Sequence, residues 1–226
     1  MEDQMFLDCF GCDIDYSLGK NFADFADQFS KDSRYRTELY KLRRKFMSHA
    51  DGLIHADLHT SNILASRDEM KVIDMEFAFM GPFGYDLGYL VGNIISQYCA
   101  ACFKRFPSEQ NRKQFKAYLL ATIKSLIETY MKTFTLCWER SVKERYRGQQ
   151  GLLQSILQEV MVDMPGYASM VNWFRSVSEI PYPDFDVIEN KDAKRNATVL
   201  SLMIDWGIMF GRYKYQSADD LIETII

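Results

Sequence analysis

The stretch from Leu53 to Leu90 holds most of the residues of this chain that could do chemistry. It contains two of the three histidines and a set of carboxylates, separated by short apolar runs: His55, Asp57, His59, Asp68, Asp74, Glu76 and Asp86. No other part of the chain brings so many potential metal ligands and bases together, so the search for a function starts here.

Four residues of this stretch have a recognisable spacing. Asp57 follows a short apolar run, Asn62 comes five residues later, Asp74 ends the next apolar run, and Glu76 lies two residues beyond it. An Asp in a loop, followed by an Asn and by an Asp at the end of a strand, is a recurrent set in phosphoryl transfer. The first Asp accepts the proton of the attacking hydroxyl. The Asn and the second Asp hold Mg²⁺, which neutralises phosphate charge.

Short elements must position these residues. Leu53-Ile54 is expected to form a buried strand, and Ile63–Ala65 with Met70–Ile73 a β-hairpin around a polar turn at 66–69. Met80–Gly84 is expected to form no regular element, because its Gly and Pro residues interrupt one. The hairpin would give the two candidate loops a rigid base from which they converge.

Helices are expected on both sides of this small β element. Apolar spacing predicts helix from Phe22 to Met47, with Asp32 or Ser33 capping a second helix within it. From Tyr85 onward the chain is expected to be helical almost to its end, with breaks at Gly148 to Gly151 and at Pro165-Gly166. The helical segments expected there are Ser108–Arg147 as one helix or two, Leu152–Val162, Ala168–Val177, Lys191–Phe210, and a short last helix capped near Ser217. Residues 1–20 are expected to be an irregular lead-in, and 180–184 a loop.

Composition limits the classes of protein that remain. The 226 residues are 47% hydrophobic and 14% aromatic, which indicates a packed globular chain. A net charge of -4 predicts no nucleic-acid partner, and no apolar run is long enough to span a membrane. Five cysteines without a signal peptide predict a reduced, cytoplasmic protein. The C-x-x-C pairs at Cys9 and Cys99 are far apart, so a shared zinc site is not expected.

The central stretch also resembles known kinases. His55-Ala56-Asp57-Leu58-His59-Thr60-Ser61-Asn62, followed by Ile73-Asp74, is similar to the catalytic core of the aminoglycoside phosphotransferase and choline kinase group. The run Val72–Phe79, then Gly81-Pro82, Gly84 and Asp86-Leu87-Gly88, resembles the methylthioribose kinase family, which has Asp-x-Glu where protein kinases have Asp-Phe-Gly. The resemblance is strong over residues 53–95.

The resemblance implies both a fold and an activity. The fold is α+β and mainly α: residues 1–226 would form one protein-kinase-like C-terminal lobe, with the catalytic core at 53–90 and a helical remainder at 91–226. Asp57 would be the catalytic base, and Asp74, Glu76 and Asn62 would bind Mg²⁺ and ATP. Asp86 would brace the catalytic loop, and His55 and His59 are expected to order it through hydrogen bonds. The implied reaction moves the γ-phosphate of ATP to the 1-hydroxyl of 5-methylthioribose, in methionine salvage.

The chain departs from the family pattern in two ways. The family holds ATP in an N-terminal lobe with a Gly-rich loop and a strand lysine, and neither is found before residue 55. The family also grips its sugar with an arginine pair, which falls on or near Asn172-Trp173 here, with Arg175 adjacent. Trp173 and Arg175 are therefore the candidate substrate contacts, and the ATP lobe is expected to be absent.

Other functions stay open. Without the ATP lobe, the chain could be a catalytically impaired homologue that acts as a binding or scaffold domain. It could also be another phosphotransferase of the aminoglycoside or choline type. A metal-dependent hydrolase built on His55-x-Asp57-x-His59 is a weaker hypothesis, because no further His follows residue 60. The resemblance also implies a homodimer.

Overall fold

A computed structural model describes Phe6, residues 20–177 and residues 182–226 of the chain. Apart from Phe6 and Lys20, the irregular lead-in expected at residues 1–20 lies outside the described residues, and so does the first part of the loop expected at 180–184. Within the described part, no helix is both long and apolar enough to cross a lipid bilayer.

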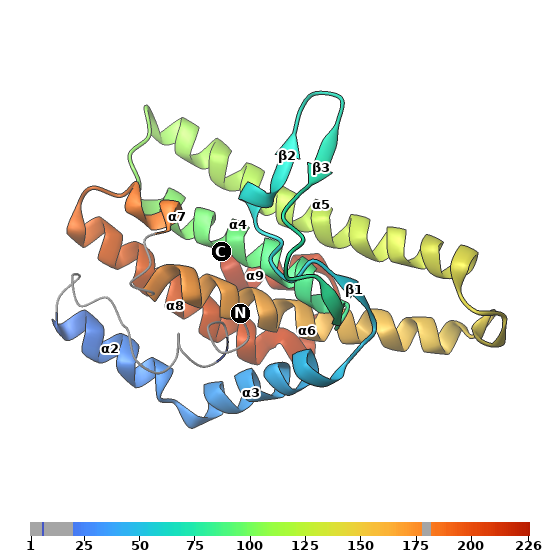
Figure 1. Cartoon of the computed structure of the whole chain (residues 1–226). Helices are drawn as coiled ribbons and strands as arrows, with labels where there is room; N and C mark the ends of the chain where they lie inside the picture. The colour runs from blue at the N-terminus through green and yellow to red at the C-terminus, as the bar shows by residue number, and fades with distance from the viewer. Residues whose placement is uncertain (1–5, 7–19, 178–181) are drawn as a thin grey trace.

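The described structure is mainly helical, as expected (Figure 1). Helices α4, α6 and α8 pack against one another, α5 packs on α4, and α3 lies across α6 and α8. The α-helices are α2 (Lys20–Ser30), α3 (Ser33–Ser48), α4 (Gly84–Phe103), α5 (Glu109–Ser141), α6 (Gln150–Val177), α7 (Pro183–Asp186), α8 (Lys191–Gly211) and α9 (Ala218–Ile225). Short 3₁₀ turns cover Thr60–Asn62 (η3), Glu144–Tyr146 (η4) and Arg212–Lys214 (η5).

Local polar residues set several helix starts. The Asp32 carboxylate accepts hydrogen bonds from the backbone N–H groups of Arg34 and Tyr35 and so caps α3. Ser217 and Asp220 form a reciprocal capping box at α9. Both caps confirm what the sequence predicted, because capping depends on residues within one turn.

Four short strands form two antiparallel pairs in the described chain. The predicted hairpin is confirmed: β2 (Ile63–Ala65) pairs with β3 (Met70–Val72) and projects from the helical body (Figure 1). The second pair joins β1 (Gly52–Ile54) to β4 (Phe79–Gly81), with Ile54 opposite Phe79. The prediction that Met80 and Gly81 belong to no regular element is therefore wrong. The partner strand lies 25 or more residues earlier, so local turn propensity gave no sign of it.

Helix α6 contradicts the break predicted at Pro165-Gly166, because it continues through both residues. Proline costs a helix one hydrogen bond, and it crowds the carbonyl one turn before it. Here tertiary packing holds the helix together, because α6 packs against α3, α4 and α8. The Arg212 guanidinium also donates to the carbonyl of Val162 at 3.1 Å, one residue after the carbonyl that Pro165 leaves without its helical partner.

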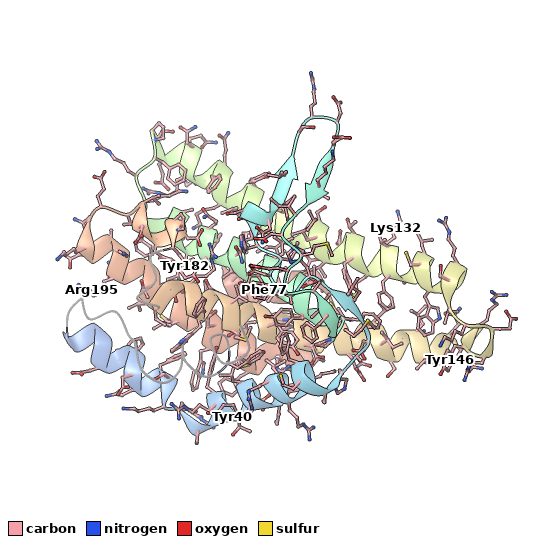
Figure 2. The ribbon with its side chains drawn as sticks, viewed as in Figure 1. Tyr40, Phe77, Lys132, Tyr146, Tyr182 and Arg195 are labelled. Atoms are coloured by element: carbon pink, nitrogen blue, oxygen red, sulfur yellow. The ribbon has the colours of Figure 1, made fainter. Side chains whose placement is uncertain are left out.

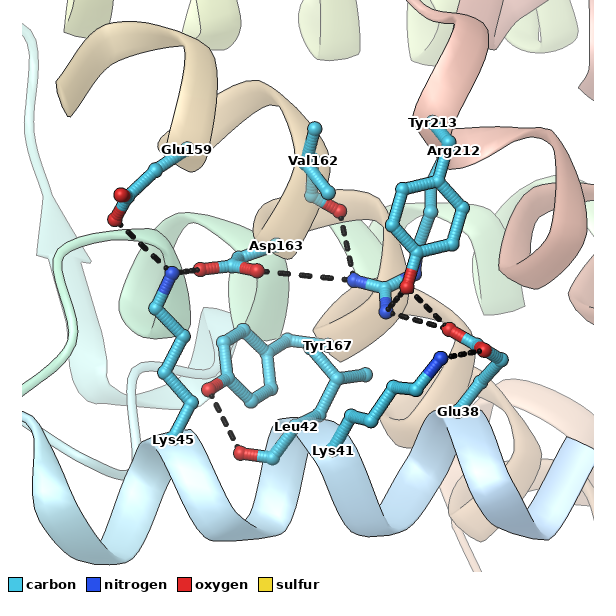
Figure 3. A network of polar contacts seen from close by, with 10 residues as sticks. All are labelled: Glu38, Lys41, Leu42, Lys45, Glu159, Val162, Asp163, Tyr167, Arg212 and Tyr213. Carbon is cyan, nitrogen blue, oxygen red and sulfur yellow. Dashed lines mark hydrogen bonds and ion pairs between the residues drawn. The ribbon is translucent and has the colours of Figure 1, made fainter. Parts of the chain in front are cut away.

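A network of charges joins α3 to α6 and to the end of α8 (Figure 3). Arg212 is 2% exposed and lies 2.9 Å from a carboxylate oxygen of Glu38 and 3.7 Å from one of Asp163. Lys45 lies 2.5 Å from Asp163 and 3.1 Å from Glu159. Every charge at the centre of the network faces an opposite one, which is what burial of charge requires.

Candidate active site

The loop that carries Asp57 is fixed by Asp86. Strand β1 delivers the chain to His55, and the first turn of α4 places Asp86 beneath it. The two carboxylate oxygens of Asp86 accept hydrogen bonds from the backbone N–H groups of His55, at 2.6 Å, and Ala56, at 2.9 Å. Burial raises the pKa of Asp86, and these two bonds partly oppose that rise. The bracing role expected of Asp86 is confirmed.

The ring of buried His55 connects this loop to the second candidate segment. Its Nδ1 accepts a hydrogen bond from the Asp57 backbone N–H at 3.3 Å, so the proton of a neutral ring lies on Nε2. That nitrogen is 2.8 Å from the carbonyl of Ile73, the residue before Asp74. His55 therefore orders the loop through hydrogen bonds, as expected, and holds Asp57 in register with Asp74.

Asn62 supplies further links between the two segments. It is 5% exposed, and its amide nitrogen donates to the carbonyl of Asp57 at 3.1 Å. The backbone carbonyl of Asn62 accepts a hydrogen bond from the backbone N–H of Ile73 at 3.0 Å. The 3₁₀ turn η3 creates this position by reversing the chain between the loop and β2. The structure thus brings the segments of Asp57, Asn62 and Asp74 together.

The side chain of His59 lies beside Asp57. Its Nε2 is 3.5 Å from a carboxylate oxygen of Asp57, and its backbone N–H donates to the Asp57 carbonyl at 2.9 Å. The backbone bond tightens the turn that follows Asp57, and this agrees with the ordering role expected of His59.

Both candidate segments contain backbone in the left-handed region. Ala56 has φ of 68° and Asp74 has φ of 65°. They are the only non-glycine residues with positive φ in the described chain. Asp visits this region more readily than Ala, whose Cβ crowds the carbonyl. Such strain is found where surrounding structure imposes it, often at functional sites. Here the two hydrogen bonds to Asp86 hold the Ala56 segment in place.

The donor atoms near Asp74 are suited to a hard cation. Asp74 and Glu76 are exposed and offer carboxylate oxygens, and Asn62 offers an amide oxygen. The described residues contain no cluster of three or more His, Cys, Asp or Glu that could hold a metal by itself. Mg²⁺ is usually held by one or two carboxylates together with substrate phosphates, so this set fits Mg²⁺ carried in with a nucleotide.

Tyr89 is a neighbour of Asp57 that sequence reasoning missed. It is buried on α4, and its ring lies 5.9 Å from that of Tyr85. Burial is the main cause that raises the pKa of Tyr89, and the nearby Tyr85 and Asp57 raise it further. A signal was present in the sequence: Tyr89 follows Asp86 by three residues and so shares its helix face.

The two candidate substrate residues lie in different surroundings. Trp173 is 0% exposed and stacks on Phe29, with ring centroids 5.2 Å apart. The Arg175 guanidinium pairs with Asp184 at 2.6 Å and lies 4.5 Å from the ring centre of Tyr182. Trp173 is thus packed in the core. Arg175 lies next to Tyr182, which is itself a neighbour of Tyr89. Their contacts with a substrate stay predictions.

Comparison with known proteins supports the resemblance seen in the central stretch. Residues 15–126 match the phosphotransferase enzyme family. The methylthioribose kinase of Geobacillus thermodenitrificans is 32% identical over 223 residues, covering 97% of this chain and 53% of that protein. That of Bacillus cereus is 28% identical over 218 residues, covering 96% and 52%. The chain is related to the methylthioribose kinases.

The relationship extends well beyond the motif but not over the whole of these enzymes. The kinase of Exiguobacterium sibiricum is 28% identical over 195 residues, covering 86% of this chain and 48% of that protein. The chain therefore spans about half the length of the curated relatives it matches. The resemblance is confirmed, and so is the mainly helical α+β fold expected from it.

Proposed function

We propose that this chain is the catalytic half of a small-molecule kinase that moves the γ-phosphate of ATP to a hydroxyl of a sugar, with 5-methylthioribose as the favoured acceptor in methionine salvage. The observation that carries the proposal is that hydrogen bonds join the loop of Asp57 to the segment before Asp74. His55 and Asn62 both bond to Ile73, and so hold the segment that carries Asp57 against the segment that leads into Asp74 and Glu76. The similarity to methylthioribose kinases supports the acceptor.

In this proposal Asp57 accepts the proton of the attacking hydroxyl. The hydrogen bonds from the backbone N–H groups of His55 and Ala56 to Asp86 keep the loop of Asp57 in place, so little reorganisation is needed during the reaction. Asn62, Asp74 and Glu76 would hold Mg²⁺ with the ATP phosphates. When bound, this ion neutralises the charge of the transferring phosphoryl group. Because the reaction uses ATP, the proposal also includes a cytoplasmic location.

The ATP-holding half is proposed to lie on another part of the complete enzyme. The segment from β1 to β4 exposes a run of large apolar side chains beside the candidate site: Leu53, Leu64, Met70, Val72, Ile73, Met75, Phe77 and Met80. Leu53 is 68% exposed and Met70 is 70% exposed. A patch of this kind marks an interaction surface. An ATP lobe over it would bring the nucleotide to Asp74.

The test is reconstitution. The half of the Geobacillus thermodenitrificans methylthioribose kinase that this chain does not match is fused to the chain, and transfer of phosphate from ATP to 5-methylthioribose is measured. Asp57→Asn should lower kcat by at least about a hundredfold, because a positioned base contributes on that scale. Asp68→Asn, an exposed change in the hairpin turn, is the matched control. Unchanged turnover in Asp57→Asn, with native circular dichroism, would rule out Asp57 as the base.

The alternative is a binding domain without catalysis, which the half-length match favours. The two are separated by a thermal shift of the fused protein with Mg²⁺ and ATP. The kinase proposal predicts stabilisation that Asp74→Asn removes, and the binding-domain alternative predicts none. Replacing 5-methylthioribose by choline or an aminoglycoside in the same assay then identifies the acceptor class.

A further inference from the structure

A cavity lies between the outer halves of α5 and α6, and its lining includes none of Asp57, Asn62, Asp74 and Glu76. It has a volume of about 560 Å³ and is lined by aromatic and aliphatic side chains that include Phe83, Trp138, Tyr146, Leu152 and Ile156. The two helices extend beyond the rest of the body as an arm (Figure 1), and Tyr146 lies towards the end of this arm (Figure 2). The volume falls within the range of cavities that bind small organic molecules.

Some of the charged side chains that line the cavity already have an ion-pair partner, and others do not. Lys45 lies between two carboxylates of α6, at 2.5 Å from Asp163 and 3.1 Å from Glu159. Asp51 and Lys143 also line the cavity, and both are exposed. Neither has an ion-pair partner among the residues that the structure describes. One carboxylate and one ammonium group are therefore available to a ligand.

These observations define the class of ligand. The aromatic and aliphatic walls favour an apolar body, the Asp51 carboxylate a positive group, and the Lys143 ammonium a negative one. We propose that the cavity binds a small zwitterion with an apolar side chain, that is, a free α-amino acid of aromatic or long aliphatic type. Its ammonium group would face Asp51 and its carboxylate would face Lys143.

The cavity shares its wall with segments that build the candidate active site. Asp51 directly precedes β1 and lies six residues before Asp57, and its N–H donates to Gly81 of β4. Phe83 and Gly84 lie at the start of α4, just before Asp86. The Tyr130 hydroxyl donates a hydrogen bond to the Phe83 carbonyl at 2.9 Å. A ligand in the cavity would thus contact both segments that fix the Asp57 loop.

The experiment titrates the full chain with L-phenylalanine by calorimetry. Saturable binding at one site per chain is expected. Phenethylamine and 3-phenylpropanoate, which each lack one charge, and L-alanine, which lacks the apolar body, should bind more weakly. Asp51→Asn and Lys143→Gln should each weaken binding of L-phenylalanine by about 2- to 5-fold, the range of an exposed ion pair. Trp138→Ala should weaken it by removing one wall.

Arg140→Gln is the matched control, because Arg140 is an exposed cation of α5 outside the cavity lining. Asp51 and Lys143 are exposed, so their substitutions should leave the melting temperature unchanged, and this is checked first. The proposal fails if no saturable binding occurs up to about 10 mM L-phenylalanine. It fails equally if either singly charged analogue binds as tightly, or if Arg140→Gln weakens binding as much as Lys143→Gln does.

Discussion

At the scale of single residues, the core holds a carboxylate with no counter-charge. Asp205 on α8 is 0% exposed; one of its oxygens accepts from the Asn172 amide at 2.8 Å, and the other has no hydrogen-bond partner in the described structure. Burial raises the pKa of Asp205 well above its usual range, and the bond from Asn172 opposes this only in part. The neutral form is therefore the one that suits the core.

Asp205→Asn should change how stability depends on pH. Because the pKa of Asp205 is higher in the folded than in the unfolded chain, its stabilising contribution is complete below the unfolded pKa. It is lost as pH rises through the folded pKa. Asparagine does not ionise, so the variant does not lose stability in this way. Its free energy of unfolding, relative to that of the parent, should therefore rise with pH above about 4, by at most about 1.4 kcal/mol per pH unit. Urea unfolding from pH 4 to 9 measures it, with exposed Asp68→Asn as the control. A parallel pair of curves would contradict the argument.

At the scale of elements, close approach of α4 and α6 sets the position of Asp86. Gly88 and Gly92 lie one turn apart on α4 and face α6. A Cβ at Gly88 would lie 2.5 Å from the carbonyl oxygen of Met164, and one at Gly92 would lie 2.5 Å from that of Ala168. These are backbone atoms, which cannot move aside without moving the helix. The absence of a side chain at both positions therefore sets the helix spacing.

Gly88→Ala should destabilise the protein by about 1–3 kcal/mol, because α4 and α6 must separate to admit the methyl group. Gly151→Ala is the matched control: it lies in α6, a Cβ added there would meet nothing within 4 Å, and alanine should stabilise the helix by about 0.5–1 kcal/mol. Chemical unfolding of both variants gives the two free energies. Equal effects of the same sign would show that helix propensity alone decides them.

At the scale of the whole molecule, the network around Arg212 ties the N-terminal helix pair to the rest. Glu38 of α3 meets Arg212 and Tyr213 from the far end of the chain, at 2.9 and 2.5 Å (Figure 3). Burial acts to raise the pKa of Glu38, but hydrogen bonds from Lys41, Tyr213 and Arg212 outweigh it and lower that pKa to about 2. The ionised form is thus favoured in the fold.

Glu38→Gln should remove this contribution. Because the folded pKa is depressed, the stabilisation is present above the unfolded pKa, near 4.5, and is lost as pH falls to about 2. The variant should be less stable by about 3 kcal/mol at pH 7, since Arg212 loses a buried partner. That difference should shrink between pH 4.5 and 2. Thermal melts across this range measure it. Glu144→Gln, whose ion pair is exposed, should stay within about 0.5 kcal/mol of the parent.

The sequence by itself determined the features that depend on neighbours in the chain. The caps Asp32 and Ser217 act within one turn, and the β2–β3 hairpin is closed by its own turn residues. The spacing of Asp57, Asn62 and Asp74 likewise predicted where the candidate site lies, and the comparisons support the family it indicated. Their individual roles await the reconstitution test.

Only the tertiary structure decided the features that depend on contacts between distant segments. Strand β4 forms because β1 supplies its partner, and α6 continues through Pro165 because its packing against α3, α4 and α8 holds the helix together. Trp173 is placed in the core by Phe29, far away in sequence. The same holds for the site. The hydrogen bonds that join His55 and Asn62 to Ile73 connect the segment before the hairpin to the segment after it, so the spacing of residues alone could not reveal them.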